Sequence, residues 1–468
     1  MNKLLMIGID SMDSELLSKY LEFMPNFKKL KETTPKIKME SVFPPDSDTA
    51  WASIYTGLNP AEHGVVGFVD PLKKSVEIQT KESEADFIRG KTFWDYASDT
   101  GKKVIVLLPH IAYPPWKING VMVSRSRVID GVKACPPIKN YDISRLNSPK
   151  GVPKKNKKNL NKLALDYKKL VLEEKKFFLK MIKNEWDLFF CYSSALDAIQ
   201  HYYWNYCDNN SPDYIENNPF SDLIKDFYVL YDSMVGELIQ EAGHGVKTII
   251  LSDHGHQGRP LKLVNINEIL KKHGFVKETS KYNINNSIEN IKSKSVVWIS
   301  KYDIGWVASK ILKVFPKFMN FYISNLSIDL DSSAAYVTDL SGVKSYTYGG
   351  IKIKKTKNYE KIRDSIIKIL KDEIGDLILF ISKKEEIYQG KYLYKYPDIL
   401  IQLKNGYGLG NRINVPIVSD AHTSKIVPGS HRGDTPIFFI QDEEKKVNVE
   451  TISLSDISKI VSDLIDLK

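Results

Sequence analysis

The chain has 468 residues, of which 42% are hydrophobic, and its formal net charge is +10. This length and composition can supply a large core, and they exclude a disordered or fibrous class. The positive charge favours anionic partners, although a Lys-rich, solvated surface produces the same excess.

Short apolar runs alternate with longer helical patterns along the chain. The runs predict strands at residues 3–9, 103–108, 187–192, 246–251, 377–381, 398–403 and 436–440. This alternation predicts an α/β fold with a doubly wound, mainly parallel sheet flanked by helices. Ligands of such sheets bind beyond the carboxyl ends of the strands, where Asp10 and Asp253 both lie.

The segment 260–345 breaks this alternation, and we predict that it is an inserted cap or lid. Residues 1–259 and 346–468 then form the catalytic core. An aromatic and basic pattern over residues 298–322 fits the buried face of a lid, kinked at Pro316, and it also fits a membrane-surface helix. The lysine-rich run 154–158 predicts a flexible connection that leads into a helix.

The cysteines and the apolar segments bear on the compartment. Cys135, Cys191 and Cys207 are too few and too irregularly spaced for a disulfide framework, so we expect a reducing, cytoplasmic compartment. No stretch reaches the roughly 20 apolar residues of a membrane span, and no signal peptide is apparent. We therefore expect a soluble protein.

Ser47 lies in the first segment with a chemical signature. Pro44 and Pro45 precede it, and Gly57 with Pro60 predicts the end of a helix that starts near Ser47. Backbone N–H groups and the helix dipole favour an anion at such an N-terminus, so the Ser47 hydroxyl would be well placed to attack phosphorus. The alternative is that Ser47, Asp48 or Thr49 only caps the helix.

Three further segments carry residue types that ligate metals. Asp197 and His201 are four residues apart in a helical context, so both would project from one helix face. Asp253 and His254 follow an apolar strand, with Gly255 allowing a tight turn in a ligand-bearing loop. His431 lies in a polar loop just before the last predicted strand.

These residues, in this order, resemble the alkaline phosphatase superfamily, most closely its type I phosphodiesterase/nucleotide pyrophosphatase branch. The resemblance covers nearly the whole chain apart from the cap. It implies that Ser47 is the nucleophile, and that two divalent metal ions are bound, zinc or else manganese. It implies that one ion is held by Asp197, His201 and His431, and that the other is held beside Ser47 by Asp10, Asp253 and His254.

The resemblance implies hydrolysis of phosphate esters, by a phosphodiesterase or a phosphatase, through a phosphoserine intermediate. The expected partner is a phosphorylated small molecule or a lipid-linked substrate, and nucleic acid is not expected. Phe68 stands where nucleotide pyrophosphatases typically carry an Asn that contacts phosphate, which counts against nucleotide substrates. Ser47 also lacks the Pro and Arg that follow a sulfatase nucleophile. Phe68, His256 and Arg432 are the candidate substrate-binding residues.

Two alternatives remain at this point. One is a phosphoryl-transferring mutase of the same superfamily, which shares this metal set. The other is a protein that binds lipid or nucleic acid through the basic cap. Six clustered ligand-type residues argue against a purely binding role, because unpaired buried carboxylates are costly without a cation.

Overall fold

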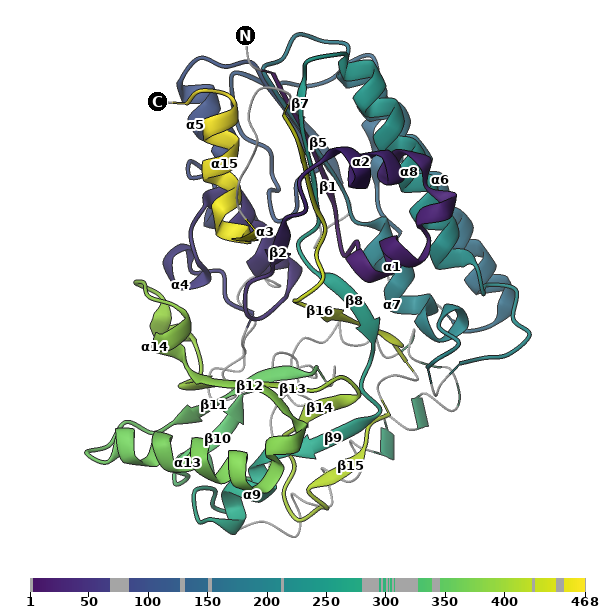
Figure 1. Cartoon of the computed structure of the whole chain (residues 1–468). Helices are drawn as coiled ribbons and strands as arrows, with labels where there is room; N and C mark the ends of the chain where they lie inside the picture. The colour runs from purple at the N-terminus through teal and green to yellow at the C-terminus, as the bar shows by residue number, and fades with distance from the viewer. Residues whose placement is uncertain are drawn as a thin grey trace.

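A seven-stranded sheet forms the centre of the larger of two lobes (Figure 1). The computed structural model describes residues 3–67, 84–126, 131–149, 154–211, 214–279, 327–338, 346–422, 426–442 and 450–467, with a few single positions between 294 and 307. The strands lie in the order β17-β7-β1-β6-β3-β4-β5. Their bounds are β1 Leu4–Ile9, β3 Val104–Leu107, β4 Gly120–Arg125, β5 Val132–Cys135, β6 Leu188–Ser193, β7 Lys247–Leu251 and β17 Phe438–Gln441.

This sheet confirms the predicted α/β class and its mainly parallel character. The neighbours from β7 to β4 pair in parallel, and only the edge strands β17 and β5 pair antiparallel. The predicted strands at 3–9, 103–108, 187–192 and 246–251 are β1, β3, β6 and β7, and the one at 436–440 is β17. The edge strand β5 and its neighbour β4 were not predicted.

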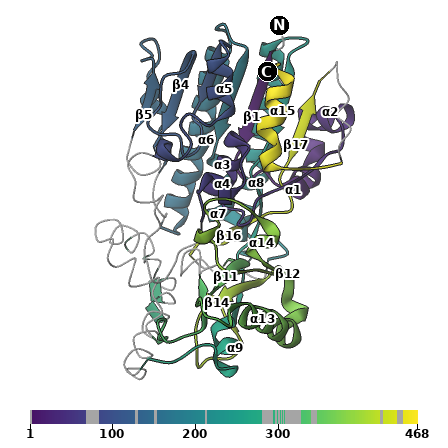
Figure 2. The same cartoon turned by 90° about the vertical axis from the view of Figure 1, so that its left-hand side faces the viewer.

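Helices cover both faces of the sheet, as Figures 1 and 2 show. On one face lie α3 Ser47–Thr56, α5 Phe93–Asp99 and α15 Ile457–Leu464. On the other lie α2 Pro25–Thr33, α6 Lys157–Met181, α7 Ala195–Cys207 and α8 Leu223–Ala242. α6 begins within the lysine-rich run, as predicted.

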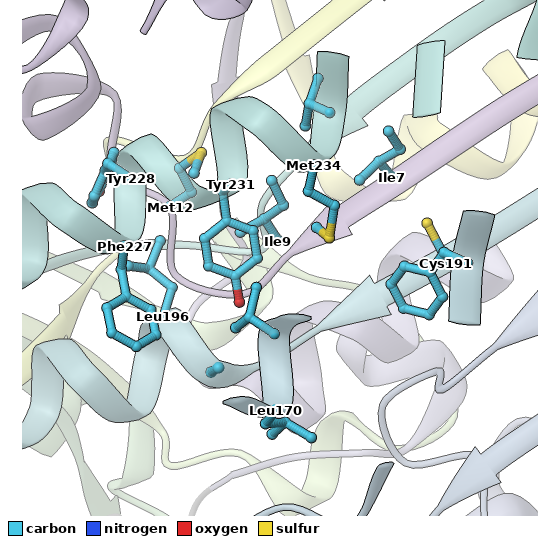
Figure 3. Packing of buried hydrophobic residues seen from close by; sticks show 14 of the residues in the cluster. Ile7, Ile9, Met12, Leu170, Cys191, Leu196, Phe227, Tyr228, Tyr231 and Met234 are labelled. Atoms are coloured by element: carbon cyan, nitrogen blue, oxygen red, sulfur yellow. The ribbon is translucent and has the colours of Figure 1, made fainter. Parts of the chain in front are cut away.

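Alternate residues of β1 enter the two cores. Leu4 and Met6 pack with the α3 side, whereas Ile7 and Ile9 pack with the α8 side. Figure 3 shows Ile7 and Ile9 among Tyr231 and Met234 of α8. A strand that is buried on both faces reads as a continuous apolar run, which is why the sequence located β1 so well.

The second lobe has two sheets and a core of its own. A four-stranded antiparallel sheet has the order β10-β11-β13-β12, and a three-stranded sheet has the order β14-β9-β15. The elements are β9 Lys262–Asn265, α9 Ile266–Lys272, β10 Ala335–Thr338, β11 Tyr348–Ile353, α13 Tyr359–Ile374, β12 Ile378–Lys383, α14 Lys384–Ile387, β13 Ile399–Leu403, β14 Tyr407–Gly410 and β15 Val418–Asp420.

The expectation that residues 377–381 and 398–403 join the parallel sheet is wrong. They form β12 and β13, which pair antiparallel with each other in the second lobe. An apolar run shows that a strand is buried but not which sheet buries it. Strands on the two sides of residue 345 thus share one sheet, and the division into a core and a cap stays a prediction. The aromatic and basic pattern over 298–322 lies almost wholly outside the described residues.

The remaining elements are short, and they lie in either lobe or between the two. They are α1 Ser14–Lys19, β2 Lys38–Glu40, α4 Pro60–His63, β8 Gly255–Gly258, β16 Gly429–Arg432 and β18 Thr451–Ser453, with 3-10 turns at Leu21–Phe23, Glu84–Phe87, Ile143–Leu146, Gly375–Leu377, Leu393–Lys395 and Leu454–Asp456. β8 and β16 form an antiparallel ribbon between the lobes (Figure 1). Within the described part of the chain, no helix has the length and apolar character that a membrane crossing requires.

Candidate metal centre

The predicted metal ligands come together at the carboxyl edge of the parallel sheet. Asp10 follows β1 directly, and Asp253 and His254 follow β7. α7 starts after β6 and presents Asp197 and His201, while the β8/β16 ribbon presents His431. Parallel strands end at the same edge, so the topology gathers residues that are far apart in sequence.

Asp197, His201 and His431 form the first group. His201 Nε2 lies 2.9 Å from His431 Nε2 and 3.4 Å from Asp197 Oδ1, and His431 Nε2 lies 3.5 Å from that same oxygen. Ligand atoms around one tetrahedral zinc ion are about 3.3 Å apart, because each lies roughly 2 Å from the metal. The spacing of the three atoms therefore fits a single ion.

Asp10, Asp253 and His254 form the second group. His254 Nε2 lies 3.2 Å from Asp253 Oδ2 and 3.8 Å from Asp10 Oδ1. The Ser47 hydroxyl is 3.1 Å from the same nitrogen. The rings of His254 and His431 stack at 4.0 Å, so the two groups adjoin, and Asp197, His254 and His431 also lie close enough to share an ion.

The histidine tautomers leave a lone pair directed into each group. Nδ1 of His201, His254 and His431 is 3.0 Å from the carbonyl oxygen of Gly429, Gly255 and Pro45, respectively. A carbonyl can only accept, so each Nδ1 carries the proton and each Nε2 is a bare acceptor. His201 and His431 thus face each other with two lone pairs, an arrangement that a cation would stabilise.

The carboxylates also have oxygens without a hydrogen-bond donor. Asp10 Oδ1, Asp197 Oδ1 and Asp253 Oδ2 are buried with no hydrogen-bond partner among the described residues, and these are the oxygens that face the histidines. Buried carboxylate oxygens without donors are costly unless a cation compensates them. This donor set of carboxylates and imidazoles suits zinc or manganese.

The electrostatics of the groups follow from burial. Burial raises the pKa of Asp253 to about 7, and burial together with Asp253 and Asp197 raises that of Asp10. Burial also raises the pKa of Asp197, but His201 and His431 outweigh it and hold that pKa well below its usual range. Burial lowers the pKa of His201 to about 4, and burial also holds the pKa of His254 well below its usual range.

Ser47 is the first residue of α3. The N-cap is Asp46, whose side chain accepts from the Asp48 N–H, so the alternative that Ser47, Asp48 or Thr49 caps the helix is wrong. The helix ends at Gly57, which has a φ of 69°, as the sequence predicts. Because Asp46 is the cap, the Ser47 hydroxyl is available for the bond to His254.

Asp10 is oriented by side chains that the sequence analysis missed. Its Oδ2 accepts from the Tyr192 hydroxyl and from Trp51 Nε1, at 3.3 Å for the latter, which leaves Oδ1 facing His254. Tyr192 also contacts His110 Nδ1 at 3.0 Å, and His110 Nε2 lies 2.9 Å from Asp48. Tyr192 and His110 lie at the carboxyl ends of β6 and β3, so the rule that found Asp10 could have found them.

Asp253 is held by the turn after Asp10. Ser11 has a φ of 64°, an uncommon conformation for a non-glycine residue, and its N–H donates to Asp253 Oδ1 at 3.0 Å. Its hydroxyl is 2.8 Å from His256 Nδ1. Gln200 donates to the Ser11 carbonyl, and this bond ties the turn to α7.

Two local expectations need correction. Residues 429–432 are not a loop but strand β16. Gly255 does not make a tight turn: it begins β8, and a Cβ atom there would overlap the side chains of Thr435 and Asp13. Glycine is needed there because other side chains approach closely, a requirement that depends on tertiary structure.

The three candidate substrate-binding residues have different surroundings. His256 is 1% exposed and packs edge-on against His201, so its geometry favours support of that ligand. The Arg432 guanidinium is bound by Glu15 and Asp434, with two hydrogen bonds to each carboxylate. Phe68 lies outside the described residues. A substrate contact by any of the three stays a prediction.

The two adjoining groups form a candidate metal centre at the carboxyl edge of an α/β sheet. The family model for type I phosphodiesterase / nucleotide pyrophosphatase matches residues 4–430, and the chain belongs to this family. It is therefore a phosphoric ester hydrolase of the alkaline phosphatase superfamily, in a metal-dependent family. No curated protein matches the sequence significantly.

Solved structures show the same fold. Human ectonucleotide pyrophosphatase / phosphodiesterase 5 is 13% identical, with a TM-score of 0.54, over 100% of this chain and 96% of its own. An inactive variant of murine ectonucleotide pyrophosphatase / phosphodiesterase 5, in complex with AMP, is 13% identical, with a TM-score of 0.53 and the same coverage. Phosphonoacetate hydrolase from Sinorhizobium meliloti 1021, in complex with phosphonoformate, is 14% identical, with a TM-score of 0.58, over 99% of this chain and 96% of its own.

Proposed function

We propose that the chain hydrolyses phosphate esters with Ser47 as the nucleophile and two divalent metal ions, zinc or else manganese. Asp197, His201 and His431 would hold one ion, and Asp10, Asp253 and His254 the other. When bound, such ions lower the pKa of a serine hydroxyl and compensate the charge on phosphoryl oxygens.

One observation supports this proposal most. The bare Nε2 atoms of three histidines and the unpartnered oxygens of three aspartates have neighbours 2.9–3.8 Å away within the two groups, and the Ser47 hydroxyl is 3.1 Å from His254 Nε2. The three histidines, Asp10 and Asp253 are each held in place by a hydrogen bond at the other side of the group, so these five side chains are preorganised for cations.

The reaction follows in two steps. The Ser47 hydroxyl gives up its proton as Oγ forms a bond to phosphorus, and the ester oxygen leaves in line and takes up a proton, which gives a phosphorylated serine. A water molecule then gives up a proton as its oxygen bonds to the same phosphorus, the bond to Ser47 Oγ breaks, Oγ takes up a proton, and phosphate or a phosphomonoester is released. The N-terminus of α3 directs backbone N–H groups toward the phosphoryl oxygens throughout.

The substrate class we propose is a phosphorylated small molecule or a lipid-linked phosphate ester. All three cysteines are free, which is consistent with the reducing, cytoplasmic compartment that we propose for the protein. A screen of monoester, diester, phosphonate and sulfate model substrates, each with zinc and with manganese, identifies the bond that is cleaved and the effective metal. Cleavage of the sulfate ester alone would contradict the proposal.

Ser47→Ala tests the nucleophile. We expect turnover of a chromogenic phosphate diester to fall by about 1,000-fold or more, while elemental analysis still finds two metals per chain. Ser18→Ala is the matched control, because that hydroxyl is on a helix and makes only exposed hydrogen bonds, to the Ser14 carbonyl and from Lys31. Near-normal turnover by Ser47→Ala, or wild-type protein without stoichiometric metal, would contradict the proposal.

A further inference from the structure

A segment of the second lobe contacts the residues just before and just after the helix that carries Ser47. We call residues 384–396 the tyrosine arm; it comprises α14, the 3-10 turn Leu393–Lys395 and the residues between and after them up to Tyr396. α14 lies beside α4 where the two lobes meet (Figure 1). Leu393, Tyr388 and Tyr396 pack with Ala61 and Phe43 in one hydrophobic cluster across this junction.

The first contact is just before α3. The Phe43 N–H donates to the Tyr388 hydroxyl at 2.7 Å, and the Phe43 carbonyl accepts from the Tyr396 hydroxyl at 2.9 Å. Two tyrosines thus bind both backbone groups of one residue, four positions before Ser47. Tyr396 is fully buried, and the Phe43 ring packs on Phe380 with a centroid distance of 5.8 Å. A hydroxyl buried in this way is shielded from water, so water does not readily replace its hydrogen bond to the Phe43 carbonyl.

The second contact is just after α3. The Tyr392 N–H donates to the Ala61 carbonyl at 2.7 Å, and Lys395 donates to the Gly64 carbonyl at 3.0 Å. The Asn59 side-chain amide donates to the Gln389 carbonyl at 3.0 Å. The tyrosine arm therefore bonds to the chain both before and after α3.

The stretch from Ser41 to Pro45 also bonds to the metal side. The Ser41 hydroxyl donates to the Asp253 carbonyl at 2.7 Å, and His431 Nδ1 donates to the Pro45 carbonyl at 3.0 Å. This stretch thus lies between the tyrosine arm and two of the proposed metal ligands. The position of the Ser47 hydroxyl relative to His254 depends on both sets of bonds.

We propose that Tyr388 and Tyr396 are positioning residues for Ser47, acting through the backbone of Phe43. This inference rests on the proposed role of Ser47 as the nucleophile. In-line attack requires the serine oxygen within a few tenths of an ångström of its reactive position, and a displacement of about 1 Å can lower a rate by about 100-fold. The second lobe then contributes to formation of the phosphoserine.

The double variant Tyr388→Phe/Tyr396→Phe tests this role, because it keeps both rings and removes only the hydroxyls. In single-turnover experiments with a chromogenic phosphate diester and metal-loaded protein, we expect phosphoserine formation to slow by roughly 10-fold to 100-fold. Metal content and the Kd for inorganic phosphate should stay at the wild-type values. Tyr394→Phe is the control, since Tyr394 belongs to the same arm and is 60% exposed.

The outcomes separate the two proposals. A wild-type enzyme that forms no phosphoserine contradicts the nucleophile assignment. A wild-type enzyme that forms it, with the double variant equally fast, contradicts only the role of the tyrosines. A loss of metal or phosphate binding that accounts for the slower rate also contradicts that role, because it would show a general structural effect. If the double variant does not fold, Tyr388→Phe alone is measured in the same way.

Discussion

Tyr192 shows how much of the candidate centre depends on residues that are not themselves proposed metal ligands. It donates to Asp10 Oδ2 and contacts His110, which in turn contacts Asp48. This chain of buried groups keeps Asp10 Oδ1 aimed at His254. Loss of a side chain that orients a metal ligand typically lowers metal affinity by about 10-fold to 100-fold.

We predict that Tyr192→Phe lowers metal affinity by roughly 10-fold to 100-fold, because Asp10 loses a donor that fixes its orientation. Titration with zinc against a competing chelator measures this affinity. Tyr96→Phe is the control, since Tyr96 is 47% exposed. Equal affinities for wild type and Tyr192→Phe would show that Trp51 alone orients Asp10.

The pKa of Asp253 predicts how pH affects the metal-free protein. Burial raises this pKa from 3.8 to about 7, and that of Asp10 shifts in the same direction. The folded chain then binds protons more tightly than the unfolded chain, so this contribution to stability is present below about pH 4 and is lost as pH rises to about 7.

We therefore expect the Tm of chelator-treated protein to fall between about pH 5 and about pH 8, and zinc to reverse most of that fall. Differential scanning calorimetry measures both effects. Asp253→Asn, which has no proton to lose, should flatten the dependence. The same slope in wild type and Asp253→Asn would contradict the assignment of this effect to Asp253.

At the scale of elements, the β8/β16 ribbon is central. It pairs His256 with His431 and crosses between the lobes, so a proposed metal ligand lies on the connection itself. Neither strand has the apolar alternation of an ordinary strand, which is why the sequence suggested loops. The pairing depends on side chains from elsewhere, including Asp13 and Thr435, which crowd Gly255.

We predict that Gly255→Ala destabilises the protein by about 1–3 kcal/mol, because the added methyl group would overlap the side chains of Thr435 and Asp13. Urea unfolding measures this change. Gly375→Ala is the matched control, since nothing lies within 4 Å of the Cβ position there. An unchanged urea midpoint for Gly255→Ala would mean that the ribbon can shift without cost.

At the scale of the whole molecule, the two lobes have separate hydrophobic cores but share the surroundings of Ser47. The core of the second lobe is built on β11 and β13, whereas two other cores cover the faces of the large sheet. The tyrosine arm, the cluster around Phe43 and the β8/β16 ribbon join the lobes.

We predict that the two lobes unfold together in the metal-loaded protein, because these links would have to break for either to unfold alone. Hydrogen exchange along a urea series, read for peptides of β1 and β7 and for peptides of β11 and β13, measures each lobe. The two sets should have the same midpoint. A second lobe that opens at lower urea while the centre stays protected would contradict this prediction.

Much of the fold could be predicted from local patterns. The central strands are buried on both faces, so β1, β3, β6 and β7 appear as apolar runs, and Gly57 marks the end of α3. The edge strand β5 and its neighbour β4 were missed, because the apolar run of β4 is only three residues long and β5 has no such run. β12 and β13 were placed in the wrong sheet, since the same apolar pattern fits a buried strand of either sheet.

The sequence by itself determined the class of fold and the family, because the ligand-type residues stand in order at the ends of apolar strands. Only the tertiary structure decided which atoms of those residues face one another. The Nδ1 bonds of the histidines, the orientation of Asp10 by Tyr192 and the hold on Phe43 by Tyr388 and Tyr396 are made between distant segments. Such bonds depend on how the chain packs, and no local pattern encodes that packing.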